Sequence, residues 1–208
     1  LQNEWKNDRW GILIGGRLDK HNMVDNVIFS PRANLRFNPT QNINLRLSYS
    51  SGFRAPQAFD EDMHIENVGG TVAMIERAKD LKEEKSQSFS VSADMYHRFG
   101  AFQTNLLIEG FYTRLTDVFV LGKPYDRGDG ILVKTRSNGP GAKVMGLTLE
   151  GKVAYLSILQ IQAGLTLQRS RYDEPHKWHD DAPAEKKIFR TPDTYGYFTA
   201  TCTPIKPL

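Results

Sequence analysis

The amino-acid sequence predicts an all-β fold of antiparallel, up-and-down strands, and three observations support this. Apolar and polar residues alternate over runs of roughly ten residues, as in strands that have one apolar and one polar face. Compact turn signals rich in Gly, Pro and Asn separate some of these runs, and long polar stretches separate others. No run of eighteen apolar residues occurs, so the sequence offers no candidate for a spanning helix.

Composition limits how much dry core this chain can form. Of its 208 residues 39% are hydrophobic, which is low for a well-cored globular protein of that length. The net charge of +3 is small and the basic residues are dispersed, so we expect no nucleic-acid partner. The single cysteine, Cys202, excludes an internal disulfide and says nothing about redox compartment. Because Leu1 replaces an initiating methionine and no signal peptide follows, we expect a longer precursor.

The first two predicted strands span residues 10–19 and 29–38, with a polar loop over residues 21–26 between them. In the first, Trp10, Ile12, Ile14 and Leu18 share one face. In the second, apolar residues at 33, 35 and 37 oppose Arg32, Asn34 and Arg36. The alternation therefore turns the basic side chains of this region to the same side.

The third strand organises the chain and lies in the stretch 42–56, N-I-N-L-R-L-S-Y-S-S-G-F-R-A-P. Its apolar residues at 43, 45, 47 and 49 form one face, and Pro56 prevents it from continuing as a paired central strand. Asn38-Pro39-Thr40-Gln41 predicts a short turn before it. The stretch after it, 53–85, is too long for an ordinary connection, and within it residues 71–81 are expected to form a short helix.

Five more strands complete a set of about eight. They are expected at residues 86–95, 102 to about 120, 147–155, 158–168 and 195–203. Arg98-Phe99-Gly100-Ala101 predicts a compact turn, and almost no loop separates the strands that meet near residue 156. Residues 131–137 suggest a hairpin arm above the long strands, and a second long polar loop covers residues 171–192.

Two classes of all-β protein fit this plan: a soluble β-sandwich and a transmembrane β-barrel. Strands of roughly ten residues match the length needed to cross a bilayer at a tilt. Turns that are short at one end and long at the other are typical of outer-membrane barrels. Aromatic residues near strand ends, such as Trp10, Tyr49, Tyr112 and Tyr155, lie where interfacial girdles form. The transmembrane barrel is therefore favoured, with apolar side chains facing lipid and polar side chains facing an interior.

Three sequence motifs carry a resemblance to a known family. They are L-R-L-S-Y-S-S-G-F-R-A-P-Q (45–57), L-K-E-E-K-S-Q-S-F-S-V (81–91) and N-G-P-G-A-K-V-M-G-L-T-L-E-G (138–151). The first resembles the family's barrel signature, the second resembles the segment that re-enters the barrel after a long outer loop, and the third resembles a glycine-rich strand start. The three motifs occur in the same order as in the family. Glu83 stands where the second pattern usually has Pro. On these motifs the chain resembles TonB-dependent outer-membrane receptors.

The resemblance implies the fold of a 22-stranded barrel closed around an amino-terminal plug. The sequence contains no plug, no TonB box and only about eight strands, so we expect residues 1–208 to be a partial barrel domain of such a receptor. Long outer loops are expected at about 53–85 and 171–192.

The resemblance also implies a function in the bacterial outer membrane. This function is the import of a scarce, bulky nutrient (siderophore, cobalamin, haem or oligosaccharide). The implied partners are the nutrient, membrane lipid and the TonB complex, which acts through the missing plug. Neither an enzymatic reaction nor a cofactor is implied. The alternative is a soluble β-sandwich binding or carbohydrate-active domain.

Candidate nutrient-binding residues lie at the strand exits and in the long loops. Arg54 is suited to an anionic ligand or a plug carboxylate, although a solvated wall ion pair is the simpler interpretation. Asp60, Asp62 and His64 gather oxygens and an imidazole, and His176, Trp178 and His179 combine two imidazoles with an indole suited to stacking. Both groups also fit solvated loops, and we assign no metal site. Glu83 and Glu84 are adjacent, so a strand would point them to opposite faces, which argues against an acid and base pair.

Overall fold

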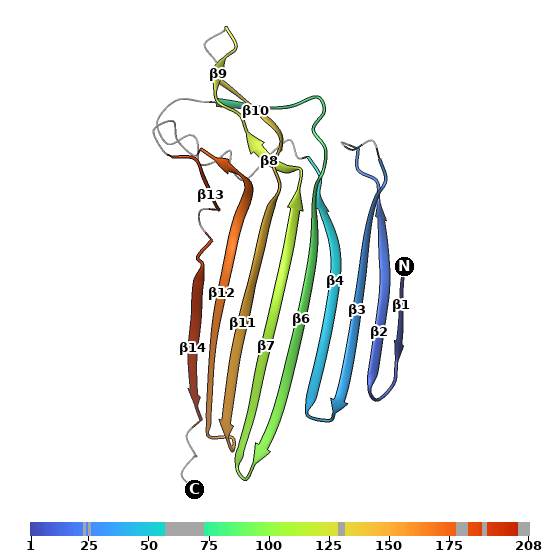
Figure 1. Ribbon diagram of the computed structural model, residues 1–208, viewed down its shortest axis with the longest axis vertical. Coiled ribbons are helices and arrows are strands. Elements are labelled where there is room, and N and C mark those ends of the chain that lie inside the picture. Colours follow the sequence, from blue (N-terminus) through green and yellow to red (C-terminus); the bar gives the residue numbers. More distant parts are fainter. Residues whose placement is uncertain are drawn as a thin grey trace.

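The computed structural model describes residues 1–22, 24, 26–56, 73–128, 132–177, 183–188 and 191–203. Its main feature is a ten-stranded antiparallel sheet in the order β1-β2-β3-β4-β6-β7-β11-β12-β13, in which β14 also pairs with β12 (Figure 1). The strands of this sheet are β1 (Gln2–Lys6), β2 (Trp10–Asp19), β3 (Ile28–Thr40), β4 (Ile43–Arg54), β6 (Glu84–Phe99), β7 (Phe102–Thr116), β11 (Ala142–Tyr155), β12 (Leu159–His176), β13 (Glu185–Lys187) and β14 (Thr194–Cys202).

The two ends of the sheet differ as the sequence predicts. Tight turns join β1 to β2, β3 to β4, β6 to β7 and β11 to β12 at the lower end in Figure 1, and the long connections lie at the upper end. In the β6–β7 turn Gly100 has φ +60°, a conformation that glycine adopts without steric cost. The prediction of short turns at one end and long excursions at the other is confirmed.

The apolar side chains form one continuous face across the long strands. Strand register places Leu35, Leu47 and Val91 in one row, and the same row continues through Gly110 to Leu147 and Leu167. These side chains are open to the surroundings, with Leu47 52% and Val91 59% exposed. Within the described residues the only buried hydrophobic side chains are those of Val24, Ile28, Val133 and Ala142. These strands therefore do not form the dry centre between two sheets that a β-sandwich needs.

Aromatic side chains border this apolar face at two levels. Register aligns Tyr49, Phe89 and Tyr112 in an upper row, and Phe99, Phe102 and Tyr155 in a lower row. Phe102 and Tyr112 are ten residues apart in β7. At about 3.4 Å per residue and a tilt of about 40°, this separation corresponds to roughly 25 Å across a bilayer. The apolar band between the rows therefore has the height of a membrane-facing barrel wall.

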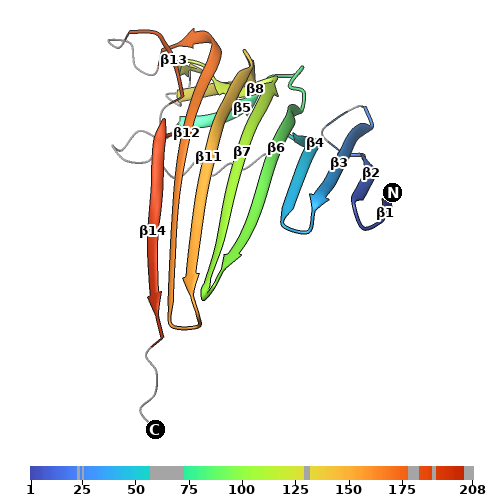
Figure 2. The ribbon, with the colours of Figure 1, turned by 60° about the horizontal axis from the view of Figure 1, so that its bottom comes forward.

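A second sheet of four strands lies across the upper ends of β6, β7 and β11 (Figure 2). It has the order β5-β10-β8, with β9 paired to β10. Its strands are β5 (Ala73–Arg77), β8 (Val118–Leu121), β9 (Tyr125–Asp126) and β10 (Leu132–Gly139). The expected arm at 131–137 is thus observed as β10, whereas the strand expected to run to about residue 120 breaks at Asp117, where φ is +55°.

The prediction of a short helix within residues 71–81 is wrong. Residues 73–77 form β5, which pairs in parallel with residues 132–136 of β10. This pairing joins segments about sixty residues apart in the sequence. The tertiary contact therefore outweighs the local helix propensity of residues 73–77. Nor does any helix long and apolar enough to cross a membrane occur in the part of the chain that the structure describes.

Strands also extend into both stretches predicted as long loops. β4 continues to Arg54 and β6 begins at Glu84, and β12 continues to His176. Pairing with β11 and β13 supports the upper part of β12, because Tyr172 lies opposite Ala142 and His176 opposite Glu185.

Candidate functional site

The polar face of the main sheet is linked by side-chain hydrogen bonds between neighbouring strands. The hydroxyls of Ser88 and Thr113 are 3.0 Å apart, and those of Thr148 and Thr166 are 3.1 Å apart. Gln162 Nε2 donates to the hydroxyl of Tyr197 at 2.7 Å. Because each pair bridges two strands, the face is a fixed wall of polar groups rather than a set of independent side chains.

An arginine patch on β3 and β4 stands out in this wall because it holds a buried guanidinium nitrogen without a hydrogen-bond partner among the described residues. Arg36 and Arg46 are directly opposite each other in the sheet, and cross-strand like charges are unfavourable. Arg46 donates to Asn44 Oδ1 at 2.9 Å, whereas the buried Nε of Arg36 has no hydrogen-bond partner among the described residues. Arg32, four residues before Arg36 and on the same face, hydrogen-bonds Gln2. The patch is therefore suited to an anionic group from outside this chain segment.

The alternation in the sequence predicts that these basic side chains share one side, but it does not identify them as site residues. The alternation within 32–36 and 43–49 contained the signal for their common face. The direct opposition of Arg36 and Arg46 depends on strand register, which the alternation alone leaves open to shifts of two residues.

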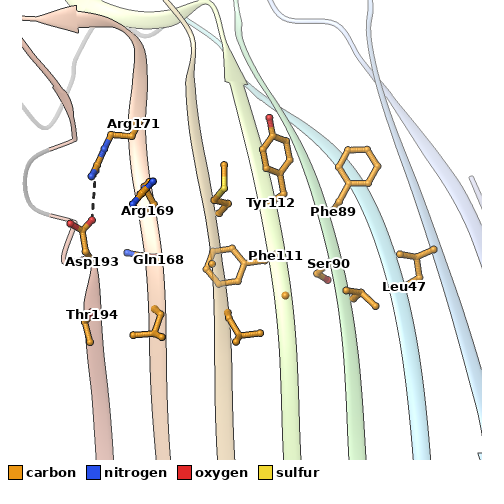
Figure 3. A pocket seen from close by; sticks show the side chains of 16 residues that line it. Leu47, Phe89, Ser90, Phe111, Tyr112, Gln168, Arg169, Arg171, Asp193 and Thr194 are labelled. Carbon is orange, nitrogen blue, oxygen red and sulfur yellow. Dashed lines mark ion pairs between the residues drawn. The ribbon is translucent and has the colours of Figure 1, made fainter.

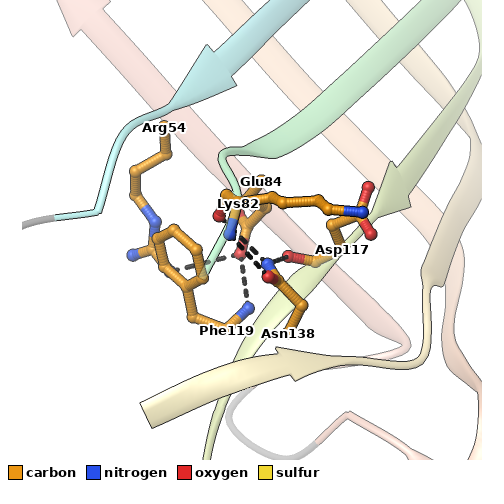
Figure 4. A network of polar contacts seen from close by, with 6 residues as sticks. All are labelled: Arg54, Lys82, Glu84, Asp117, Phe119 and Asn138. Carbon is orange, nitrogen blue, oxygen red and sulfur yellow. Dashed lines mark hydrogen bonds and ion pairs between the residues drawn. The ribbon is translucent and has the colours of Figure 1, made fainter. Parts of the chain in front are cut away.

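Arg54 lies in a polar network where β4 leaves the sheet (Figure 4). Its Nη2 is 3.2 Å from Glu84 Oε2, and its guanidinium lies over the Phe119 ring, 4.9 Å from the centroid. The backbone N–H of Phe119 donates to the same Glu84 oxygen at 3.0 Å. Arg54 therefore joins β4, β6 and β8, and half of its side chain remains exposed.

Asn138 forms the other half of this junction. Its Nδ2 donates to the carbonyl oxygens of Lys82 and Asp117, at 3.1 and 2.8 Å. Its Oδ1 accepts from the Lys82 backbone N–H at 2.8 Å (Figure 4). A single amide thus connects β10 to the segment before β6 and to the break between β7 and β8.

Glu83 and Glu84 point to different partners, as the sequence predicts. Glu83 pairs with Lys85 at 2.9 Å, whereas Glu84 pairs with Arg54. Burial raises the pKa of the Glu83 carboxyl, but the hydrogen bond and charge of Lys85 outweigh burial and hold that pKa below its ordinary value. Neither carboxyl is arranged as half of an acid and base pair.

Most of the predicted loop contacts lie outside the described residues: Asp60, Asp62, His64, Trp178 and His179. His176 ends β12, where its backbone pairs with Glu185. Among the residues that the structure describes, no three His, Cys, Asp or Glu side chains gather into a metal-binding group.

A shallow depression of about 780 Å³ lies on the apolar face (Figure 3). Leu47, Phe89, Val91, Tyr112 and Leu147 line it, and Arg169 and Arg171 border one end. Because these side chains lie on the opposite face from the arginine patch, the depression and the polar wall are separate sites.

Comparisons with known proteins agree with this architecture. The family described as TonB dependent receptor-like, beta-barrel matches residues 1–201. By sequence, no curated protein matches the chain.

Solved structures of outer-membrane transporters are similar to the chain. The FrpB iron transporter from Neisseria meningitidis (F3-3 variant) has a TM-score of 0.61 and 17% identity, covering 82% of this chain and 25% of that chain. The siderophore receptor PirA from Pseudomonas aeruginosa has a TM-score of 0.65 and 17% identity, covering 83% and 34%. The copper transporter OprC has a TM-score of 0.64 and 12% identity, covering 98% and 32%. The chain thus spans about a quarter to a third of these proteins, and identities this low show similarity of fold alone.

Proposed function

We propose that this chain, which belongs to the TonB-dependent receptor-like β-barrel family, forms part of the wall of a receptor that imports a scarce, bulky nutrient across the bacterial outer membrane. The family consists of outer-membrane receptors and transporters, not enzymes. In this proposal residues 1–208 are a partial barrel domain, the remaining strands and a plug belong to the rest of the receptor, and TonB supplies energy through that plug.

The observation that carries the proposal is the division of one sheet into two unlike faces. The apolar face is exposed over a height of roughly 25 Å, which fits the lipid-facing band of an outer-membrane barrel. The polar face carries hydrogen-bonded hydroxyls, amides and arginines, which fit a wet interior. The long connections gather at one end, where outer-membrane receptors carry their extracellular loops.

The nutrient we propose is a metal-containing one, such as a ferric siderophore. This choice is supported by the similar structures, which are named as an iron transporter, a siderophore receptor and a copper transporter. The arginine patch of Arg32, Arg36 and Arg46 supports an anionic group in the lumen, on the ligand or on the plug. Arg54, Asp60, Asp62, His64, His176, Trp178 and His179 remain candidate ligand contacts.

An uptake assay on cells that carry the full-length receptor tests this function. We expect cells to accumulate a labelled ferric siderophore, and loss of TonB to abolish accumulation while surface binding persists. Accumulation that is unaffected by loss of TonB would contradict energy-coupled import. Absence of binding across siderophores, haem, cobalamin and oligosaccharides would contradict the nutrient class.

Arginine variants then test the lumen patch in the same assay. The double change Arg36→Gln and Arg46→Gln should lower binding or uptake about tenfold, because two charge-assisted hydrogen bonds to an anion are lost. The matched control is Arg98→Gln, an arginine on the polar face of β6 beside the β6–β7 turn, six residues from Ser92, which pairs with Arg46; it should leave uptake unchanged. Equal effects of the two changes would show that the patch has no specific role.

A further inference from the structure

Two glycines of β2 lie directly opposite two arginines of the arginine patch. Register pairs Gly11 with Arg36 and Gly15 with Arg32, all on the polar face of the sheet. A Cβ atom at Gly11 would lie 3.2 Å from Arg36 Nε and 3.4 Å from its Nη2. A Cβ atom at Gly15 would lie 3.2 Å from Arg32 Nε. Each arginine therefore leans across to β2 and lies over a glycine, in space that a side chain there would fill.

This lean accounts for the environment of the Arg36 guanidinium. Its Nε atom is buried, because the side chain lies against the backbone of β2 at Gly11. Arg46 lies opposite Arg36 on the other neighbouring strand, β4. Leaning toward β2 therefore takes the Arg36 charge away from the like charge of Arg46, which lowers their repulsion. The glycine gives Arg36 one favoured position on the wall.

The wall itself supplies no counter-charge to these arginines. Asp94 of β6 lies in the next row of the polar face, opposite Asn44. Its carboxylate accepts hydrogen bonds from the Tyr96 hydroxyl, at 2.8 Å, and from the Asn105 side-chain amide. Among the residues that the structure describes, neither Arg36 nor Arg46 forms an ion pair with a carboxylate. An anionic partner of Arg36 must therefore come from outside the described wall.

We propose that Gly11 and Gly15 are positioning residues for the arginine patch, holding Arg36 and Arg32 on the wall so that both are ready for an anionic group. This inference rests on the proposed function, in which that group enters the lumen. An anion that binds a mobile arginine must immobilise a long side chain, which costs conformational entropy. An anion that binds Arg36 meets a side chain that the fold has already fixed. The glycines thus contribute to affinity without touching the bound group.

Gly11 is the better position for a test. A Cβ atom at Gly15 would also lie 3.2 Å from the backbone oxygen of Leu1, so a substitution there would disturb β1 as well. The three nearest atoms to a Cβ at Gly11 all belong to the Arg36 side chain. A side chain at position 11 therefore acts first on Arg36.

The first measurement is the rate at which phenylglyoxal, a reagent for accessible guanidinium groups, modifies Arg36 in the full-length receptor in detergent. Peptide mass spectrometry quantifies the product at this residue. Gly11→Val should raise the rate roughly threefold, because the displaced side chain regains its freedom. Gly11→Ala should raise it less, because its Cβ requires a shift of only a few tenths of an ångström. Gly151→Val is the matched control and should leave the rate unchanged, since a Cβ there meets nothing within 4 Å.

The second measurement is uptake of a labelled ferric tris-catecholate, an anionic iron chelate, by cells that carry the receptor. Gly11→Val should lower uptake roughly threefold, since binding must then immobilise Arg36. In the Arg36→Gln receptor the same change should have no further effect, because the glycine acts through Arg36. Heat-dependent mobility on a gel checks that each variant barrel has folded.

Two results would overturn the proposal. One is an Arg36 modification rate that is the same in Gly11→Val and in the unchanged receptor. The other is an equal loss of uptake from Gly11→Val with and without Arg36, because position 11 would then act through the fold. If the unchanged receptor takes up no ferric tris-catecholate, the choice of nutrient fails, whereas the modification rate still decides whether Gly11 positions Arg36.

Discussion

Glu84 joins three strands at the upper end of the sheet. One carboxylate oxygen receives both the Arg54 guanidinium and the Phe119 backbone N–H, so it holds β4 and β8 to the start of β6. The Arg54 side chain is half exposed, whereas that of Glu84 is 15% exposed. Solvent therefore screens the ion pair between Arg54 and Glu84. Solvent does not replace the Glu84 oxygen as the acceptor for the partly buried N–H of Phe119.

This asymmetry predicts different costs for the two truncations. Glu84→Ala should lower the free energy of unfolding by about 1–3 kcal/mol, because the Phe119 amide loses its acceptor. Arg54→Ala should cost less than about 1 kcal/mol. Urea unfolding of the receptor in lipid vesicles measures both, with Arg17→Ala, which breaks an exposed pair with Asp19, as the control. Equal losses at positions 54 and 84 would mean that the amide contact contributes nothing.

Glu83 gives the outer end a defined pH dependence. Its pKa in the folded state is lower than the ordinary value of 4.5, because Lys85 favours the charged form. The stabilisation by the Glu83–Lys85 pair is therefore complete above about pH 4.5 and is lost as pH falls through the lower folded value. Glu83→Gln should cost about 1 kcal/mol at pH 7 and progressively less below pH 4.5. A difference in unfolding free energy that stays constant between pH 7 and pH 3 would contradict this.

At the scale of the element, each long strand separates two environments. In β4, Leu47 belongs to the apolar face and is 52% exposed, whereas the adjacent Ser48 lies opposite Ser90 on the polar face. The strand therefore tolerates charge on one side and excludes it on the other. Because adjacent residues are at nearly the same depth, they form a matched pair for testing which face meets lipid.

Arginine substitutions at these two positions give the test. Leu47→Arg should destabilise the receptor by about 1–2 kcal/mol, because Leu47 lies one row inside the upper aromatic row, where a cation costs less than at the middle of the bilayer. Ser48→Arg should change stability by less than about 1 kcal/mol, because the lumen face is wet. Unfolding free energies measured in lipid vesicles decide between them. A larger loss for Ser48→Arg would mean that the faces are assigned the wrong way round.

At the scale of the whole molecule, the chain forms an open arc with unpaired strand edges and an uncovered apolar face. Among the described strands, β1 stands at one end of the main sheet and β14 pairs only with β12 at the other (Figure 1). Such edges and such a face drive association unless the remaining strands and lipid cover them.

We therefore expect residues 1–208 expressed alone to aggregate or to require detergent. Size-exclusion chromatography with light scattering, with and without detergent, measures this. Refolding together with the remaining strands of the receptor should give a heat-resistant barrel. A monodisperse monomer of residues 1–208 in plain buffer would contradict the assignment of the apolar rows to lipid.

The sequence by itself determined the all-β class, the two unlike faces, the strands with their short turns at one end, and the family resemblance. It could do so because a period of two residues and turn chemistry are local properties, readable without knowing what pairs with what. Tertiary structure alone decided that residues 73–77 are a strand, that Arg36 opposes Arg46, and that Glu84 gathers β4 and β8. Each of these depends on register or on pairing between distant segments, and the energy of such contacts is absent from any short stretch of sequence.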